Sequence, residues 1–155
     1  MKVFQGRATT HVDAPADAVF DLLTDVSRLP EWNRAIEAVV DDPGPLTPGT
    51  EWTVTMHPPR LPRWGSISHL ERIDPQELQF AYRTRNADGN PSWVDWSWTA
   101  TNADDGCDVT VEWTCHLETL DRRFLAGPMR KRQLAREVPK SLEALARAVA
   151  PSGAA

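Results

Sequence analysis

Two residues in the sequence could do chemistry in a cavity: Tyr82, which is expected to point inward, and His69, whose facing the sequence leaves open. A histidine titrates near neutral pH, so His69 could exchange a proton with a ligand if it faces a cavity. Tyr82 alternates with Leu78 and Phe80, which predicts that all three share the inner face of one strand. Its hydroxyl could orient a ligand or donate a hydrogen bond to a developing enolate. The alternatives are a solvated histidine and a core tyrosine bonded to the backbone, and both stay open.

The strand that carries His69 gives conflicting signals about which way this side chain points. Gly65, Ile67 and Ile73 have the same parity as His69, and the two isoleucines favour an inward position for the set. Leu70 has the opposite parity and argues against it, unless a β-bulge shifts the register. We take Ile67 as a candidate ligand contact. His69 and Tyr82 are the candidates for catalysis, although the sequence leaves the catalytic residues unknown.

Several motifs of enzymes and metal sites are absent from the sequence. There is no Gly-rich phosphate loop, no Gly-x-Ser-x-Gly elbow and no His-Glu-x-x-His, which disfavours a hydrolase or a nucleotide-dependent enzyme. Cys107 and Cys115 fall on one predicted strand, eight positions and roughly 26 Å apart, which is too far for a disulfide. No spacing of Cys and His indicates a set of metal ligands. We therefore expect neither a metal nor a cofactor.

The chain has seven tryptophans against a single tyrosine, and several of them alternate with apolar residues. Trp52, Val54 and Met56 form one alternating series, and residues 94–100 and 109–115 contain two more. Alternation places each series on one face of a strand, so indoles from three strands point toward the same interior. This is more aromatic bulk than a sheet needs to cover one helix. It favours the wall of a large apolar cavity, with plain core packing as the alternative.

We therefore predict that a hydrophobic ligand contacts the inner faces of these strands and the start of the C-terminal helix. At the helix start, Leu125, Met129 and Gln133, together with Phe124, could form a mouth or lid. The predicted ligand-binding residues are Trp52, Val54, Met56, Ile67, Phe80, Tyr82, Trp96, Trp98, Trp113, Phe124, Leu125, Met129 and Gln133.

Apolar periodicity and turn signals predict the elements that position these residues. A strand over residues 3–12 precedes a helix for which Asp13 is a plausible N-cap and residues 19–23 supply the buried side. Ser27 can cap a second short turn, which Pro30 should end. Six further strands are predicted between turn clusters, over residues 35–40, 50–57, 64–73, 78–85, 93–101 and 109–116.

The C-terminal segment predicts one long helix from Pro128 to Val149, which Pro139 should bend. Its apolar residues recur at helical period, at Leu134, Val138, Leu142, Leu145 and Val149. A strand, two short helices, a run of antiparallel strands and a long helix make an α+β layout. Only the last helix is long enough to cover the dry face of the sheet.

Three segments resemble the START-like or SRPBCC superfamily, in particular its polyketide cyclase/dehydrase-like branch. They are residues 11–20 (HVDAPADAVF), 25–32 (DVSRLPEW) and 73–78 (IDPQEL), and the order of elements matches over nearly the whole length. The opening segment is moderately specific for the superfamily but not for any activity within it.

The resemblance implies a helix-grip fold, in which a seven-stranded antiparallel sheet wraps around the long C-terminal helix and encloses a deep cavity. We expect a single domain over residues 1–150, followed by a disordered tail at 151–155. The resemblance implies a bacterial protein that binds an aromatic, polyketide-like or lipid-like molecule. It could also act as a cofactor-free cyclase, aromatase or dehydratase, and the fold alone does not choose between these activities.

The net charge is −5, but residues 121–140 carry seven basic and two acidic side chains, which is +5. A solvated helix face is the simpler interpretation. The alternative function is a protein-interaction module of the chaperone-activator type that uses the basic stretch Arg122–Arg136. A chain this acidic overall is not expected to bind nucleic acid, and no stretch is apolar enough to span a membrane. We expect a cytoplasmic monomer or homodimer, since no secretory h-region is visible at the N-terminus.

Overall fold

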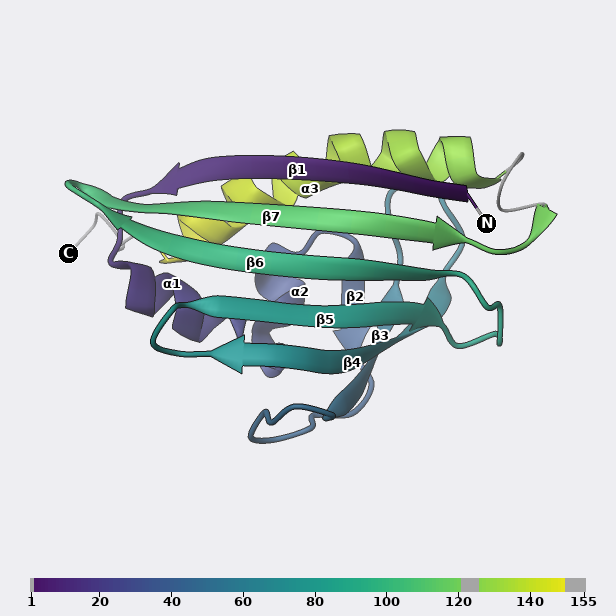
Figure 1. Cartoon of the computed structure of the whole chain (residues 1–155), viewed down its shortest axis with the longest axis horizontal. Coiled ribbons are helices and arrows are strands. Elements are labelled where there is room, and N and C mark those ends of the chain that lie inside the picture. Colours follow the sequence, from purple (N-terminus) through teal and green to yellow (C-terminus); the bar gives the residue numbers. More distant parts are fainter. Residues whose placement is uncertain (1, 121–125, 150–155) are drawn as a thin grey trace.

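A computed structural model describes residues 2–120 and 126–149 (Figure 1). The predicted tail at 151–155 lies outside the described residues. The elements in chain order are β1 Lys2–Val12, α1 Ala16–Leu23, a 3₁₀ turn at Val26–Arg28, α2 Leu29–Trp32, β2 Ile36–Val39, β3 Glu51–Met56, β4 Trp64–Asp74, β5 Gln79–Asn86, β6 Trp93–Ala103, β7 Gly106–Leu117 and α3 Gly127–Val149.

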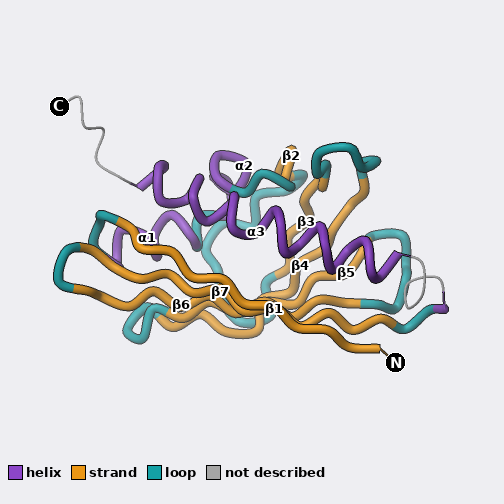
Figure 2. The backbone as a smooth tube through the Cα atoms, turned by 90° about the horizontal axis from the view of Figure 1, so that it is seen from above, coloured by secondary structure: helices purple, strands orange, loops and turns teal. Residues whose placement is uncertain are grey.

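The strands form one seven-stranded antiparallel sheet in the order β1-β7-β6-β5-β4-β3-β2. Figure 2 shows α3 running along one face of this sheet, with α1 and α2 on the same side. The apolar stripe predicted for the last helix is buried there, with Leu134, Val138, Leu142 and Leu145 each no more than 6% exposed. The predicted α+β helix-grip arrangement, with two short helices after the first strand, is confirmed.

Two local predictions about helix ends are wrong. Asp13 does not cap α1, because the N-cap position is Pro15. The amide of Ala16 instead donates to Oδ1 of Asn102 at 3.2 Å, so the end of β6 supplies the capping oxygen. Pro30 does not end a turn but lies in the first turn of α2, where its missing N–H would have no partner in any case.

The strand β7 lies between β1 and β6 and carries the largest buried group of this part of the core. Cys107 and Cys115 both lie on β7, as predicted, and are buried free thiols. Trp113 of β7 stands opposite Gly6 of β1 on one side and Trp96 of β6 on the other. A Cβ atom on Gly6 would lie 2.1 Å from Cζ2 of Trp113. Glycine is therefore required at position 6, because the indole lies directly over the backbone of β1.

We expect Gly6→Ala to destabilise the protein by about 1–3 kcal/mol, the usual range for forcing an extra methyl group into a packed core. Chemical denaturation monitored by circular dichroism measures this loss. The control is Gln5→Ala, on the exposed face of the same strand, which should unfold like the wild type. An unchanged midpoint for Gly6→Ala would show that Trp113 does not lie over position 6.

His11, near the end of β1, is surrounded by carboxylates at the turn between β6 and β7. Its Nδ1 lies 2.9 Å from Oδ1 of Asp108, and its Nε2 lies 3.2 Å from Oδ1 of Asp105 and 3.5 Å from Oδ1 of Asp13. The hydrogen bond with Asp108, aided by the charges of the other two aspartates, raises the pKa of His11 above its usual 6.5. The protonated ring therefore links β1 to the β6–β7 turn.

A raised pKa in the folded state means that the charged His11 stabilises the fold below pH 6.5, and that this contribution disappears as the pH rises through the folded-state pKa. We expect the melting temperature of the wild type to exceed that of His11→Gln at pH 6, and the gap to narrow by pH 9. Thr9→Ala on the same face is the non-titrating control. A difference in melting temperature between the wild type and His11→Gln that stays constant from pH 6 to pH 9 at low salt would contradict the raised pKa of His11.

Candidate ligand-binding site

A cavity of about 80 Å³ lies between the inner face of the sheet and α3, with residues of α1 and α2 at one end. Apolar and aromatic side chains supply most of its lining, and polar side chains come from β4, β5 and α3. The lining residues are Leu23, Val26, Leu29, Trp32, Asn33, Ala35, Ile36, Trp52, Val54, Met56, Ser66, Ser68, Phe80, Tyr82, Thr84, Trp96, Trp98, Arg130, Gln133, Leu134, Glu137, Val138 and Ser141.

The sheet side of the cavity is a continuous wall of aromatic rings. The ring centroids of Trp52 and Tyr82 are 5.6 Å apart, those of Phe80 and Tyr82 are 5.0 Å apart, and those of Tyr82 and Trp96 are 6.5 Å apart. These separations are typical of favourable aromatic pairs. The rings therefore form one surface that runs from β3 across β5 to β6, which we call the aromatic wall.

Small residues on β4 make this wall possible. β4 lies between β3 and β5, yet rings from β3 and β5 contact each other across it. The inward residues of β4 at this point are Ser66 and Ser68, both buried, and Ser68 stands directly opposite Trp52. A larger side chain at either serine would occupy the space that the rings use.

Two indole N–H groups of the aromatic wall are paired within the wall itself. Nε1 of Trp98 donates to the Tyr82 hydroxyl at 3.1 Å, and Nε1 of Trp96 donates to Oγ1 of Thr84 at 3.2 Å. Burial raises the pKa of Tyr82 to about 12, although the hydrogen bond from Trp98 acts in the opposite direction. Tyr82 is therefore a neutral phenol near pH 7 that accepts from Trp98 and keeps its own proton.

The helical side of the cavity carries two buried polar atoms without a hydrogen-bond partner among the described residues. They are Nε1 of Trp32 on α2 and Oε2 of Glu137 on α3. Trp32 is 1% exposed and Glu137 is 8% exposed, and Nζ of Lys140 lies 3.9 Å from the other carboxylate oxygen of Glu137. Buried polar groups are nearly always paired, so an exception in a cavity wall indicates a place for a ligand or an ordered water.

Of the four polar residues of α3 that line the cavity, Gln133 was predicted as a ligand contact, whereas Arg130, Glu137 and Ser141 were missed although a signal for them exists. Arg130, Gln133, Glu137 and Ser141 follow one another at steps of three and four residues, which puts them on one side of a helix. This polar stripe runs beside the apolar stripe. Only the apolar stripe was used to predict which face is buried, so Glu137 was not recognised as an inward carboxylate.

Most of the predicted ligand contacts lie around this cavity, but several do not. Trp113 is buried outside the lining and packs on Trp96, with ring centroids 5.9 Å apart. Met129 is 63% exposed and does not line the cavity. Phe124 and Leu125 lie outside the described residues. The predicted residues that do line it are Trp52, Val54, Met56, Phe80, Tyr82, Trp96, Trp98 and Gln133.

Ile67, predicted as a ligand contact, does not line the cavity, and His69, whose facing the sequence left open, does not line it either. The sheet register shifts between Leu70 and Arg72, so that Ile73 packs against the core together with Leu70 and no longer shares a face with Ile67. The side chain of His69 is 45% exposed, and its Nδ1 lies 3.2 Å from Oε2 of Glu51. His69 therefore cannot exchange a proton with a molecule in the cavity.

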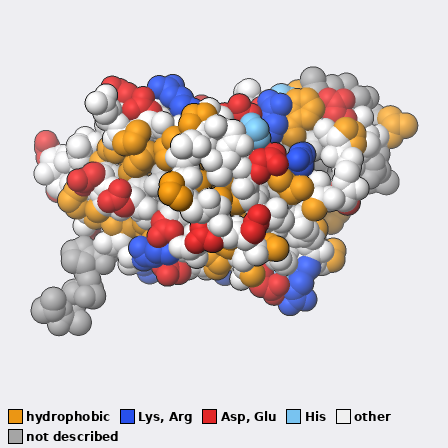
Figure 3. Space-filling model, turned by 90° about the horizontal axis from the view of Figure 1, so that it is seen from below, with side chains coloured by type: hydrophobic (Ala, Val, Ile, Leu, Met, Phe, Trp, Pro, Cys, Tyr) orange, Lys and Arg blue, Asp and Glu red, His pale blue; other side chains and the backbone are white. Residues whose placement is uncertain are grey.

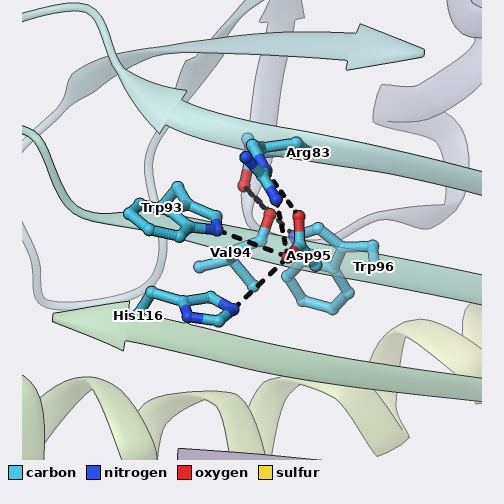
Figure 4. Close-up of polar contacts among 7 residues, drawn as sticks. Arg83, Trp93, Val94, Asp95, Trp96 and His116 are labelled. Atoms are coloured by element: carbon cyan, nitrogen blue, oxygen red, sulfur yellow. Dashed lines mark hydrogen bonds and ion pairs between the residues drawn. The ribbon is translucent and has the colours of Figure 1, made fainter. Parts of the chain in front are cut away.

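A second cluster of polar side chains lies on the opposite, outer face of the sheet (Figure 4). Arg83 donates to both carboxylate oxygens of Asp95, at 2.7 and 3.1 Å. Nε1 of Trp93 and Nε2 of His116 each lie 3.3 Å from Oδ2 of Asp95, and the two rings stack with centroids 4.4 Å apart. Partial burial raises the pKa of Asp95, but Arg83 and these partners outweigh it and lower the pKa overall.

This outer cluster links β5, β6 and β7 through the donors around Asp95, and Nδ1 of His116 is buried there without a partner among the described residues. Elsewhere on the surface, acidic and basic side chains lie scattered among apolar and uncharged ones on the face that Figure 3 shows. Within the basic stretch, Lys131, Arg132 and Arg136 are exposed. Arg130 instead lines the cavity, donates to Oε1 of Gln133 and lies over the Trp64 ring at 5.5 Å. The predicted protein-interaction function of this stretch stays a prediction.

Comparisons with known proteins agree with this arrangement. A family model described as polyketide cyclase/dehydrase and lipid transport matches residues 4–150, whereas no curated protein shows significant similarity to the chain. None of the helices within residues 2–120 and 126–149 has the length and apolarity needed to cross a membrane.

Several solved structures share the fold over nearly the whole chain. Ara h 8.0201 is 18% identical with a TM-score of 0.70, and the match covers 96% of this chain and 98% of that one. Protein CV1439 from Chromobacterium violaceum is 18% identical with a TM-score of 0.73, covering 96% and 98%. The Zhui aromatase/cyclase from Streptomyces sp. R1128 is 21% identical with a TM-score of 0.69, covering 96% and 94%. At these identities the likeness shows the fold alone.

Proposed function

The chain belongs to the polyketide cyclase/dehydrase and lipid transport family, and we propose that it binds a hydrophobic small molecule, aromatic, polyketide-like or lipid-like, between the sheet and α3. The observation that carries this proposal is the aromatic wall, whose rings border a cavity instead of filling it. Flat apolar molecules gain affinity from burial and from stacking on such rings.

The size of the cavity limits what enters without rearrangement. A volume of about 80 Å³ exceeds the roughly 10–15 Å³ that one water needs. It is smaller than the roughly 300–1,000 Å³ of pockets for drug-sized ligands. A molecule of several fused rings therefore requires widening. Arg130 and Gln133, whose long side chains line the cavity from the first turns of α3, are the groups best able to make way.

A second candidate function, catalysis of a cyclisation or dehydration without a cofactor, is favoured by the presence of both Tyr82 and Glu137 in the lining of one cavity. In an aldol-type ring closure, Glu137 would take a proton from the carbon between two carbonyl groups, and Tyr82 would donate a hydrogen bond to the enolate oxygen. The enolate carbon would then attack a second carbonyl carbon, whose oxygen takes up the proton. Loss of water from this alcohol would complete a dehydration.

Binding can be tested with 2-naphthol, a flat two-ring phenol, by following the quenching of tryptophan fluorescence. For the wild type we expect saturable quenching. Ser66→Leu should bind about tenfold more weakly or worse, which is ~1.4 kcal/mol, because leucine would fill space beneath the aromatic wall. Ser97→Leu, on the exposed face of β6, is the matched control and should bind normally. Thermal melts establish that both variants fold. Equal affinity for both variants would place the ligand elsewhere.

Turnover can be tested with a synthetic poly-β-ketone thioester, by mass spectrometry of the cyclised products against the spontaneous reaction. If the chain is an enzyme, Glu137→Gln and Tyr82→Phe should each lower the catalysed rate about 100-fold or more, the usual contribution of a positioned acid or base. Glu143→Gln, exposed on the same helix, should have no effect. A wild type that forms no product above the spontaneous rate would exclude this reaction and leave the binding proposal intact.

A further inference from the structure

The two unpartnered polar atoms of the cavity differ in kind, and together they describe the ligand. We propose that Glu137 and Trp32 select a neutral molecule that carries a hydroxyl group and, apart from it, a carbonyl or ether oxygen. The hydroxyl donates to Oε2 of Glu137, and the other oxygen accepts from Nε1 of Trp32. This inference rests on the proposed binding function and adds to it the polar chemistry by which ligands are told apart.

The unpartnered state of these atoms is costly unless something binds them. A buried donor or acceptor left without a partner costs about 1–3 kcal/mol, and more for a charged group. Trp32 presents a donor and Glu137 an acceptor, because a carboxylate oxygen only accepts. Nζ of Lys140 lies 3.9 Å from Oε1, so it leaves Oε2 unpaired. A molecule that carries both complementary groups would satisfy both atoms.

Both atoms belong to the same end of the cavity. Trp32 is held in place by an edge-on contact with Trp98, with ring centroids 5.4 Å apart and an angle of 83° between the rings. Two residues later the backbone N–H of Arg34 donates to Oγ of Ser141 at 3.3 Å. Ser141 follows Glu137 by one turn of α3 and also lines the cavity. The corner after α2 is therefore tied to the turn of α3 that carries Glu137.

The charges around this end favour a neutral ligand over a carboxylate. Glu137 places negative charge at the cavity wall, and like charges in a poorly hydrated site repel strongly. A hydroxyl group that donates to a carboxylate makes a charge-assisted hydrogen bond, which is stronger than one between neutral groups. Arg130 also lines the cavity, but it is engaged by Oε1 of Gln133 and by the Trp64 ring.

Four bicyclic probes of similar shape test the inference: 6-hydroxy-1-tetralone, 1-tetralone, tetralin and 6-carboxy-1-tetralone. Dissociation constants come from fluorescence titration or calorimetry of the full chain. For the wild type we expect 6-hydroxy-1-tetralone to bind about tenfold more tightly than 1-tetralone, the value of one hydrogen bond to a charged group. We expect 1-tetralone to bind several-fold more tightly than tetralin, and 6-carboxy-1-tetralone to bind most weakly.

Substitutions assign each preference to its residue. Glu137→Leu should remove the preference for 6-hydroxy-1-tetralone over 1-tetralone and leave the affinity for tetralin within about twofold. Glu137→Gln should bind 6-carboxy-1-tetralone more tightly than the wild type does. Trp32→Phe keeps an aromatic ring but removes the N–H, so it should remove the preference of 1-tetralone over tetralin. The matched controls are Glu143→Leu and Glu143→Gln on the exposed face of α3, and Trp93→Phe on the outer face of the sheet.

The outcomes separate failure of this inference from failure of the binding proposal. Equal binding of all four probes by the wild type would retain the cavity as the binding site but overturn the polar selection. Tightest binding of the carboxylate probe would also overturn it and would assign recognition to Arg130. Binding of none of the probes would overturn the proposed function itself. The four dissociation constants of the wild type are enough to overturn the inference. It therefore stays testable even if Trp32→Phe does not fold.

Discussion

The structure depends on how large rings fit on the inner face of a sheet whose strands are only about 4.8 Å apart. Aromatic side chains on neighbouring strands cannot all lie flat unless some positions between them are small. Ser66 and Ser68 provide this space on β4, where Trp52 meets the rings of β5. Gly6 provides it on β1, where Trp113 lies over the backbone. The two serines are as much a part of the aromatic wall as the rings themselves, and Gly6 makes room for Trp113, which packs on Trp96 of that wall.

Much of this arrangement could be predicted from sequence because alternation is a strict property of an unbroken strand. The inward positions on β3, β5, β6 and β7 were predicted correctly for this reason. The prediction failed on β4, where the shift between Leu70 and Arg72 exchanges the faces of the strand. Ile73 lies beyond that shift, so its inward position gave a false signal for His69, whereas the opposing signal from Leu70 was correct. A bulge changes the parity without any change in composition, so alternation alone does not reveal it.

The helical side of the site was harder to predict for a different reason. A polar residue at helical spacing is normally part of the solvated face, and apolar positions alone were used to orient α3. Glu137 is buried because α2 and the sheet cover that side of the helix, which is a tertiary effect. Asn102 is a similar case, since it caps α1 from a strand far away in the sequence. The contact of Asn102 follows from the closure of the fold and leaves no local signal, whereas the burial of Glu137 was signalled only by the polar stripe of α3.

The two sides of the cavity therefore have different parts in binding. On the sheet side, the ladder of backbone hydrogen bonds fixes the strands, and the N–H groups of Trp96 and Trp98 are already paired. This side is a rigid and largely apolar surface that offers the proton of Tyr82 and the hydroxyl groups of Ser66 and Ser68. On the helical side, α3 is held by side-chain packing, and of the two unpaired polar atoms one lies on α3 and the other on α2. Any widening for a larger ligand must come from this second side, because displacing a side chain of α3 breaks fewer hydrogen bonds than separating two strands. The element that must move is then also the one that carries Glu137, so the fit of a ligand and its polar recognition are coupled through α3.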